Sequence, residues 1–208
     1  MIPFDVQNEG GITAPNDRKG IAMRTLIVTE FISLDGVIDS PGGGDHPRAG
    51  WTFKEVPFVE EAYEIKGREQ LEAEAMLIGR VSYDEFAPVW PSMTDEFAEY
   101  NAMPKYVVST TLNDPEWNNT SVLRSLDDVA RLKEGEGGPI IVHGSATLAK
   151  GLAAAGLVDR YHLLVFPVVL GSGKRLFGDD PGLTTKLELV EHEAYSNGVV
   201  KAVYDVAR

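Results

Sequence analysis

Short apolar runs alternate with amphipathic stretches along most of the chain. Runs rich in apolar and β-branched residues predict strands, and stretches with apolar residues three or four positions apart predict helices. The expected strands cover residues 24–32, 75–79, 105–109, 139–143 and 161–165, with a short one near 121–123, and the expected helices cover residues 57–75, 125–134 and 146–155. Because helices separate successive strands, most of these strands should be parallel.

The end of the chain follows a different pattern. Residues 185–194 and 198–206 are predicted to form two strands, and the turn sequence Ser196-Asn197-Gly198 between them is typical of a β-hairpin. The expected fold is therefore α/β: a single three-layer domain with a mixed, mostly parallel sheet, helices on both faces and a C-terminal antiparallel hairpin.

The domain should span residues 23–208. Residues 1–22 are polar and interrupted by glycine and proline, and they lack the apolar segment of a signal peptide. We expect them to form a disordered N-terminal extension, or translation to start at Met23.

The composition excludes several classes of function. The 208-residue chain has no cysteine, which removes disulfides, thiolate metal sites and cysteine nucleophiles. A net charge of −13 opposes binding to nucleic acid. The four histidines show no metal-ligand spacing, so no metal site is expected. With no apolar run of membrane-spanning length and no signal peptide, we expect a cytoplasmic protein without a membrane partner.

Polar or glycine-rich segments follow the predicted parallel strands, where open α/β sheets bind their ligands. The best phosphate candidate is Gly144-Ser145-Ala146-Thr147, which joins a strand to the first amide groups of a helix. Taken alone, this motif favours Ser145 as an ordinary helix N-cap. The chain has no Walker spacing, and no G-x-G-x-x-G follows a strand, so neither a P-loop nor an ordinary Rossmann site is expected.

Other strand ends carry further candidates. Arg80 follows the strand at 75–79 and could pair either with a phosphate or with an acidic surface neighbour. Ser109, Thr110 and Thr111 offer hydroxyls at the next strand end, or ordinary turn chemistry. Asp35 lies in a turn after the first strand and is a candidate for handling a proton, although Asp-Gly is also common in turns.

Five segments, in this order, resemble the family that joins dihydrofolate reductase with the reductase domain of riboflavin-biosynthesis enzymes. The segment Met76-Leu77-Ile78-Gly79-Arg80-Val81-Ser82-Tyr83, for example, is similar to M-G-R-x-[ST]-[WY] of dihydrofolate reductase. The five segments are residues 28–38, 76–83, 105–111, 141–148 and 166–177, and the resemblance covers residues 23–207. The chain resembles a stand-alone member, because residues 1–22 are too few for the deaminase domain that usually precedes the riboflavin-type reductase.

The resemblance implies NADPH as cofactor, a homodimer, and hydride transfer to a C=N or C=O of a small heterocycle of the pterin, pyrimidine or flavin-precursor type. For such a reaction Asp35 is the candidate catalytic residue, either orienting the substrate or relaying a proton through water. Trp51 is either a stacking surface for the substrate, carried by a loop that closes over it, or a residue of the core or an interface. The implied cofactor contacts are Gly79, Arg80, Ser82, Ser109, Thr110, Thr111, Gly144, Ser145, Ala146, Thr147 and Leu148, and the implied substrate contacts are Asp35, Gly36, Trp51, Val168, Leu170, Gly171 and Gly173.

The sequence also departs from dihydrofolate reductase. Its first-helix carboxylate has no clear counterpart among Glu60, Glu61 and Glu64, and its tryptophan-containing opening loop is absent, so folate is not expected as the substrate. Two other functions stay open. A non-catalytic nucleotide- or pterin-binding protein would bind the cofactor without turnover, and a structural protein that has lost the site would not bind NADPH at all.

Overall fold

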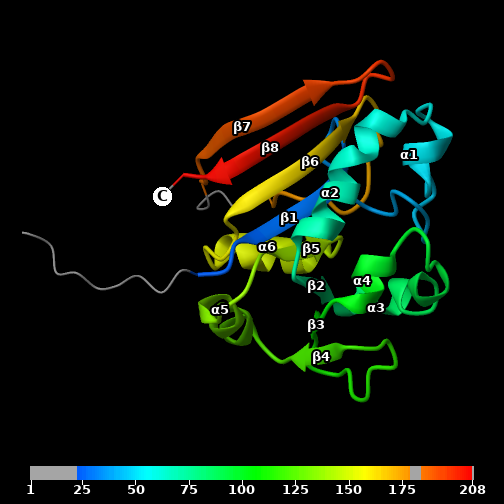
Figure 1. Ribbon diagram of the computed structural model, residues 1–208. Helices are drawn as coiled ribbons and strands as arrows, with labels where there is room; N and C mark the ends of the chain where they lie inside the picture. The colour runs from blue at the N-terminus through cyan, green and yellow to red at the C-terminus, as the bar shows by residue number, and fades with distance from the viewer. Residues whose placement is uncertain (1–22, 179–183, 208) are drawn as a thin grey trace, which may run out of the picture.

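The computed structural model describes residues 23–178 and 184–207, and its centre is one eight-stranded sheet (Figure 1). The strand order is β4-β3-β2-β5-β1-β6-β8-β7. Strands β1 to β6 pair in parallel, and β8 and β7 add an antiparallel hairpin at one edge. The strands are β1 Leu26–Ser33, β2 Ala75–Gly79, β3 Lys105–Val108, β4 Thr120–Leu123, β5 Ile140–His143, β6 Arg160–Phe166, β7 Leu187–Ala194 and β8 Val200–Val206.

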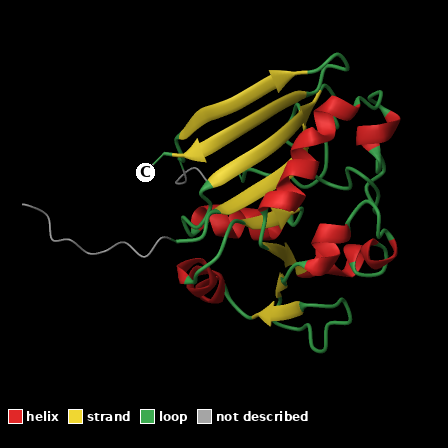
Figure 2. Ribbon diagram, viewed as in Figure 1, coloured by secondary structure: helices red, strands yellow, loops and turns green. Residues whose placement is uncertain are grey.

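Helices cover both faces of this sheet (Figure 2). Side chains of α5 and α6 pack on one face, and those of α2, α3 and α4 pack on the other. The helices are α1 Trp51–Lys54, α2 Glu64–Glu72, α3 Arg80–Phe86, α4 Ala98–Ala102, α5 Leu126–Glu134 and α6 Ala146–Ala154, with 3-10 turns η1 Glu60–Tyr63 and η2 Trp90–Ser92. The predicted three-layer architecture with its C-terminal hairpin is confirmed, whereas the expected extension over 1–22 lies outside the described residues.

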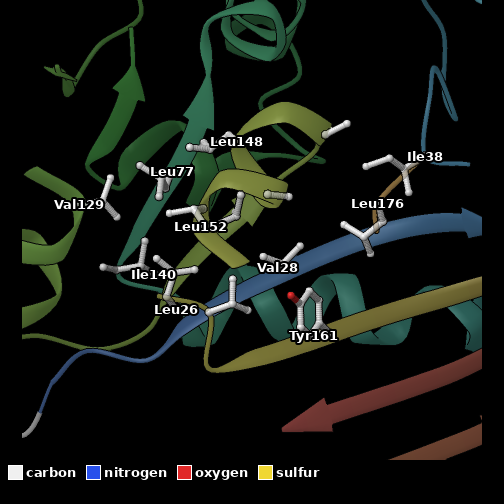
Figure 3. Close-up of a cluster of buried hydrophobic side chains, with 14 of the residues drawn as sticks. Leu26, Val28, Ile38, Leu77, Val129, Ile140, Leu148, Leu152, Tyr161 and Leu176 are labelled. Atoms are coloured by element: carbon white, nitrogen blue, oxygen red, sulfur yellow. The ribbon is translucent and has the colours of Figure 1, made fainter. Parts of the chain in front are cut away.

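The alternation of side chains along each strand separates the core into two sides. Val28 of β1 and Leu77 of β2 face Leu148 and Leu152 of α6 in one apolar cluster (Figure 3). Their neighbours in the sequence point to the opposite face, where Ile78 packs in a second cluster with residues of α3 and α4. Each fully buried leucine contributes about 2 kcal/mol relative to an exposed one, so both helix layers are held by burial of the faces that the sequence pattern predicts.

The first predicted helix is shorter than the pattern suggests. Instead of covering 57–75, it begins with the η1 turn, and α2 ends at Glu72. Phe58 is exposed, and Val59 is extended before the turn. At the other end, Ala73 is extended, so that the amide of Glu74 can donate to the Pro139 carbonyl at 2.9 Å and lead into β2. Tertiary pairing with the strand thus overrides a helical pattern that continues in the sequence.

Candidate functional site

Strand β5 lies at a point where the connections of the sheet diverge. It pairs with β2 on one side and with β1 on the other, all in parallel. The helix after β5 is α6, which packs on one face, whereas the helices after β2 and β1, α3 and α2, pack on the opposite face. Ligands of open α/β sheets bind at such topological switch points, beyond the carboxyl ends of the strands. We name the C-terminal ends of β1, β2 and β5 together the β5 switch point.

The turn that leaves β5 has an unusual backbone. Gly144 and Ser145 are both left-handed, with φ of 56° and 70°. A left-handed conformation costs a serine roughly 1 kcal/mol or more, so its surroundings must hold it in place. The Ser145 hydroxyl accepts a hydrogen bond from the backbone N–H of Gly79 at 2.8 Å and donates to the Ser82 hydroxyl at 2.7 Å. The side chain of Ser145 makes no cap hydrogen bond to α6, so the expectation of an ordinary N-cap is wrong.

This contact brings the loops after β2 and β5 together. A Cβ atom on Gly79 would lie 3.2 Å from Ser145, and one on Gly144 would lie 3.2 Å from the Ser82 hydroxyl. Glycine at both positions therefore permits the close approach. Four predicted cofactor residues, Gly79, Ser82, Gly144 and Ser145, form one contact.

The start of α6 presents free donors at the same place. The amide of Ala149 is the first to bond within the helix, to the Ser145 carbonyl at 2.9 Å. In the part of the chain that the structure describes, no acceptor is found for the amides of Ala146, Thr147 and Leu148. Unpaired amides and the helix dipole together favour an anion at this end.

Arg80 and the hydroxyl segment after β3 lie next to each other. The Arg80 Nε is 2.8 Å from both carboxylate oxygens of Asp84, and its Nη1 is 3.4 Å from the Thr111 hydroxyl. Both partners of the ion pair are substantially exposed, so it contributes little to stability and could yield to a phosphate. The Ser109 hydroxyl accepts from the amides of Thr111 and Leu112, which is ordinary turn chemistry, and Thr110 is exposed.

A second arginine, which the sequence analysis missed, reaches this segment. Arg124 follows β4 and donates from Nη1 to the Ser109 carbonyl at 2.9 Å. Because β4 pairs with β3 in parallel, the ends of both strands lie at the same end of the sheet. The signal in the sequence was the position of Arg124 directly after the short strand near 121–123.

Asp35 holds a loop in place. Its carboxylate accepts hydrogen bonds from the Ser33 hydroxyl at 2.7 Å and from the amides of Leu170 and Gly171 at 3.1 and 2.9 Å. Partial burial raises the pKa of the Asp35 carboxyl, but these hydrogen bonds outweigh it and lower the pKa to about 2. The side chain is therefore ionised at neutral pH and holds no proton of its own to donate, and a role of Asp35 in orienting the substrate or relaying a proton stays a prediction.

Most of the other predicted substrate residues lie along the same loop after β6, and the exceptions are Trp51 and Gly36, which is next to Asp35 in the turn after β1. A Cβ atom on Gly173 would lie 2.7 Å from the Val37 side chain, so Gly173 packs closely on the segment that follows Gly36. Trp51, by contrast, is fully buried: its ring packs edge-on against Phe166 at 5.4 Å and its Nε1 donates to the Asp39 carbonyl. Trp51 is a core residue, and the stacking role is wrong. Val168 packs against the same apolar cluster as Trp51.

This loop and α3 lie near the same end of the sheet. Burial raises the pKa of Glu85 in α3, and the charges of Lys174, Asp39 and Asp45 act on that carboxyl. The loop that carries the predicted substrate residues is therefore close to the helix that carries Arg80.

Comparison with known proteins identifies the family of this chain. The sequence model of the RibD C-terminal domain matches residues 24–201. The chain belongs to this family. It is 30% identical over 195 residues to the uncharacterized protein YyaP of Bacillus subtilis (strain 168), with 88% of this chain and 96% of that protein covered. A crystal structure from Shewanella sp. PV-4, named "Putative riboflavin biosynthesis protein", superposes with a TM-score of 0.68 at 19% identity and covers 88% of this chain and 99% of that one.

The RibD C-terminal domain described here also contains a buried polar network on the α2 side of the sheet. Glu69 accepts hydrogen bonds from the Thr29 hydroxyl at 2.7 Å and from His162 Nδ1 at 2.8 Å, and Lys66 lies 3.3 Å away. Burial raises the pKa of Glu69, but Lys66 and the hydrogen bond from His162 outweigh it and lower the pKa to about 2. The signal in the sequence was the place of Glu69 among the apolar positions of the predicted helix.

Three buried polar atoms of this RibD C-terminal domain have no hydrogen-bond partner within the described residues: Glu30 Oε1, Tyr100 OH and His143 Nε2. The His143 and Tyr100 rings contact each other, with centroids 4.7 Å apart. Burial lowers the pKa of His143 to about 3 and raises the pKa of Glu30 to about 8, so both side chains are neutral at pH 7. Unpaired polar groups with shifted pKa values near strand ends mark candidate functional sites, and the sequence analysis had missed Glu30.

None of the helices in residues 23–178 and 184–207 combines the length and apolar character needed to cross a membrane.

Proposed function

We propose that the protein is an NADPH-dependent reductase that transfers a hydride to a C=N or C=O of a small heterocycle of the pterin, pyrimidine or flavin-precursor type. The observation that carries the proposal is the contact of Ser145 with Gly79 and Ser82, which fixes free helix amides at a topological switch point. Membership of the RibD C-terminal domain family and the name of the Shewanella neighbour point the same way.

The residues at this end of the sheet fit the phosphates of such a cofactor. The free amides of Ala146, Thr147 and Leu148 suit a diphosphate, which needs several donors at once. Arg80 and Arg124, with the hydroxyl of Thr111, suit the additional phosphate that distinguishes NADPH from NADH. A surface hollow of about 500 Å³ beside α3 is lined in part by Leu112 and by Asp84, the ion-pair partner of Arg80.

When bound, NADPH supplies the hydride, and the chain positions the reactants and excludes water. The amides at the start of α6 and the arginines would orient the cofactor. The loop fixed by Asp35, with Leu170, Gly171 and Gly173, would border the substrate. Asp35 in this proposal is a positioning residue.

The experiment is a calorimetric titration with NADPH and with NADH, on the wild type and on Arg80→Ala. A charge-assisted phosphate contact is worth about 1.5–3 kcal/mol, so Arg80→Ala should weaken NADPH binding about 10- to 100-fold and leave NADH binding nearly unchanged. Arg131→Ala is the matched control, because Arg131 also pairs with an aspartate on its own helix, three positions away, but lies on α5.

Each outcome separates the functions that the sequence leaves open. If the wild type binds NADPH and oxidises it with one of the heterocycles, the reductase proposal stands. Binding without oxidation by any of these heterocycles favours a non-catalytic nucleotide- or pterin-binding protein. If neither nucleotide binds, the reductase proposal fails and a structural role is favoured.

The homodimer implied by the family resemblance is part of the proposal. β7 forms the edge of the sheet and exposes Leu189 and Val190. Exposed apolar residues on an edge strand suit contact with a second copy. Light scattering on the wild type and on Val190→Lys checks it, with a shift to monomer expected for the variant.

A further inference from the structure

Glu30 breaks the apolar pattern of the most buried strand. It stands between Val28 and Ile32 in β1, and because side chains alternate along a strand, it shares their face of the sheet. Val28 and Ile32 both belong to the apolar cluster under α6. Glu30 itself is only 3% exposed, and its Oε1 has no hydrogen-bond partner among the described residues. A buried carboxyl without a partner is costly, so its presence calls for a functional explanation.

The register of the sheet places Glu30 at the β5 switch point. The pairing of β1 with β5 ends at Thr29 and His143, whereas the pairing of β1 with β6 continues through Glu30 and Leu163. Glu30 is therefore the first residue of β1 beyond the end of β5. It lies beside the turn of Gly144 and Ser145, where α6 begins.

The surroundings of Glu30 keep its carboxyl protonated. Burial raises the pKa of Glu30 to about 8, and the two charges that act on it, both from α2, oppose each other: Lys66 lowers the pKa and Glu69 raises it. The first turn of α6, which covers this face, contains no acidic residue. The next ionised carboxylate along the chain, Asp35 in the turn after β1, is paired with Arg175.

Three titratable groups near this site can be compared as proton donors. Asp35 is ionised, because hydrogen bonds lower its pKa to about 2. His143 is in its neutral form at pH 7 and holds no acidic proton, because burial lowers its pKa to about 3. A general acid works best when its pKa lies near the working pH and its proton is present. Among these three, Glu30 meets both conditions.

We propose that Glu30 is the proton donor of the reduction and holds its neutral carboxyl against the nitrogen of a C=N bond in the substrate, an inference that rests on the proposed reductase function. Bound NADPH would supply a hydride to the carbon of the C=N bond and would be oxidised, and Glu30 would give its proton to the nitrogen. The C=N π bond would break while a C–H and an N–H bond form. The Glu30 carboxylate would then regain a proton from the solvent.

The first test asks whether Glu30 holds a proton and needs no substrate. Infrared difference spectra compare the wild type with Glu30→Gln, and Glu188→Gln is the control because Glu188 is an exposed carboxyl on another strand, β7. At pH 7 the wild type should show the C=O stretch of a protonated carboxyl that Glu30→Gln lacks, and this band should disappear with a midpoint near pH 8. If no such band distinguishes the two proteins, the proposal is overturned.

The second test uses oxidation of NADPH with 6-methyl-7,8-dihydropterin, which contains a C=N bond, as the probe. The kcat/KM of the wild type should fall about tenfold per pH unit above the pKa of Glu30. Glu30→Gln should lose about 100-fold in kcat and lose this alkaline decline, while its Kd for NADPH stays unchanged. Glu188→Gln should behave as the wild type does.

The outcomes distinguish this inference from the proposed function. If the wild type oxidises NADPH and Glu30→Gln keeps the same rate and pH profile, Glu30 is not the donor, although the reductase function stands. If the wild type oxidises no NADPH with any heterocycle, both fail. Glutamine has the same shape as a neutral glutamic acid, and the melting temperature of Glu30→Gln above pH 7 should be at least that of the wild type. Loss of kcat with an intact fold therefore supports the proposal.

Discussion

The hydroxyl of Ser145 lies 2.8 Å from the backbone nitrogen of Gly79 and accepts its hydrogen bond across the end of the sheet. These two residues are 66 positions apart in the sequence. Their contact joins the loop that begins α3 to the turn that begins α6. One side chain thus connects the two segments that the proposed function assigns to different phosphates of the cofactor.

Ser145→Ala should weaken NADPH binding about tenfold and lower the free energy of unfolding by about 1–2 kcal/mol. The variant leaves the Gly79 amide without its acceptor but keeps a Cβ atom at a left-handed position. Ser145→Gly loses the same hydrogen bonds but relieves the backbone, so it should be the more stable of the two. Calorimetry and urea denaturation measure both effects. Unchanged affinity in both variants would contradict a role of this turn in cofactor binding.

Asp35→Ala should destabilise the fold by about 2 kcal/mol and increase the mobility of the loop at 168–171. The variant removes the acceptor of two backbone amides, and hydrogen bonds to a charged group are stronger than average. Because folding lowers the pKa of Asp35 from 3.8 to about 2, its stabilising contribution is present above pH 4 and is lost as the pH falls toward 2. Urea denaturation between pH 7 and pH 2 measures this, and amide exchange of Gly171 reports on the loop. The control is Asp127→Ala, which also removes an aspartate but on the first turn of α5.

His143→Leu should change how stability depends on pH. Folding lowers the pKa of His143 from 6.5 to about 3, so below pH 6.5 the unfolded chain binds a proton that the folded chain excludes. The wild type should therefore lose about 1 kcal/mol per pH unit relative to the variant as the pH falls below 6.5. Glu30 changes stability in the opposite direction over the same range, so the comparison must be made between wild type and variant. His192→Leu, an exposed position on β7, should show no such slope. If the stability of wild type and His143→Leu depends on pH in the same way, folding does not exclude the proton from His143, and the prediction is wrong.

Glu69→Ala should be among the most destabilising single substitutions in α2, at about 3–5 kcal/mol. It removes the partner of Thr29, His162 and Lys66 and leaves their polar atoms buried. Folding lowers the pKa of Glu69 from 4.5 to about 2. The contribution of Glu69 to stability is therefore present above pH 4.5 and is lost as the pH falls from 4.5 to about 2. Thermal denaturation at pH 7 compares it with Glu72→Ala, which changes an exposed carboxylate on the same helix. Equal effects of the two substitutions would mean that the network contributes nothing.

Much of the fold could be predicted because it depends on short-range patterns. The apolar runs identify the strands of the sheet, and the turn before β8 identifies the hairpin. The first helix was predicted too long because its pattern continues to residue 75, whereas the pairing of Glu74 with Pro139 ends the helix earlier. Sequence periodicity does not contain that long-range hydrogen bond.

The order of the elements, their apolar faces and the glycine and serine residues at the strand ends can all be read from the chain. What those residues do depends on contacts between segments that are distant in the sequence. The Ser145 side chain accepts a hydrogen bond from Gly79 instead of capping its own helix. The Asp35 carboxylate accepts a hydrogen bond from the amide of Leu170, 135 positions away. The burial of Trp51 and Glu30 could not be predicted for the same reason, because it depends on neighbours from distant segments of the chain. Those neighbours set the pKa of a carboxyl, and so the proton on Glu30 is a property of the packed sheet and not of the residues beside it in the chain.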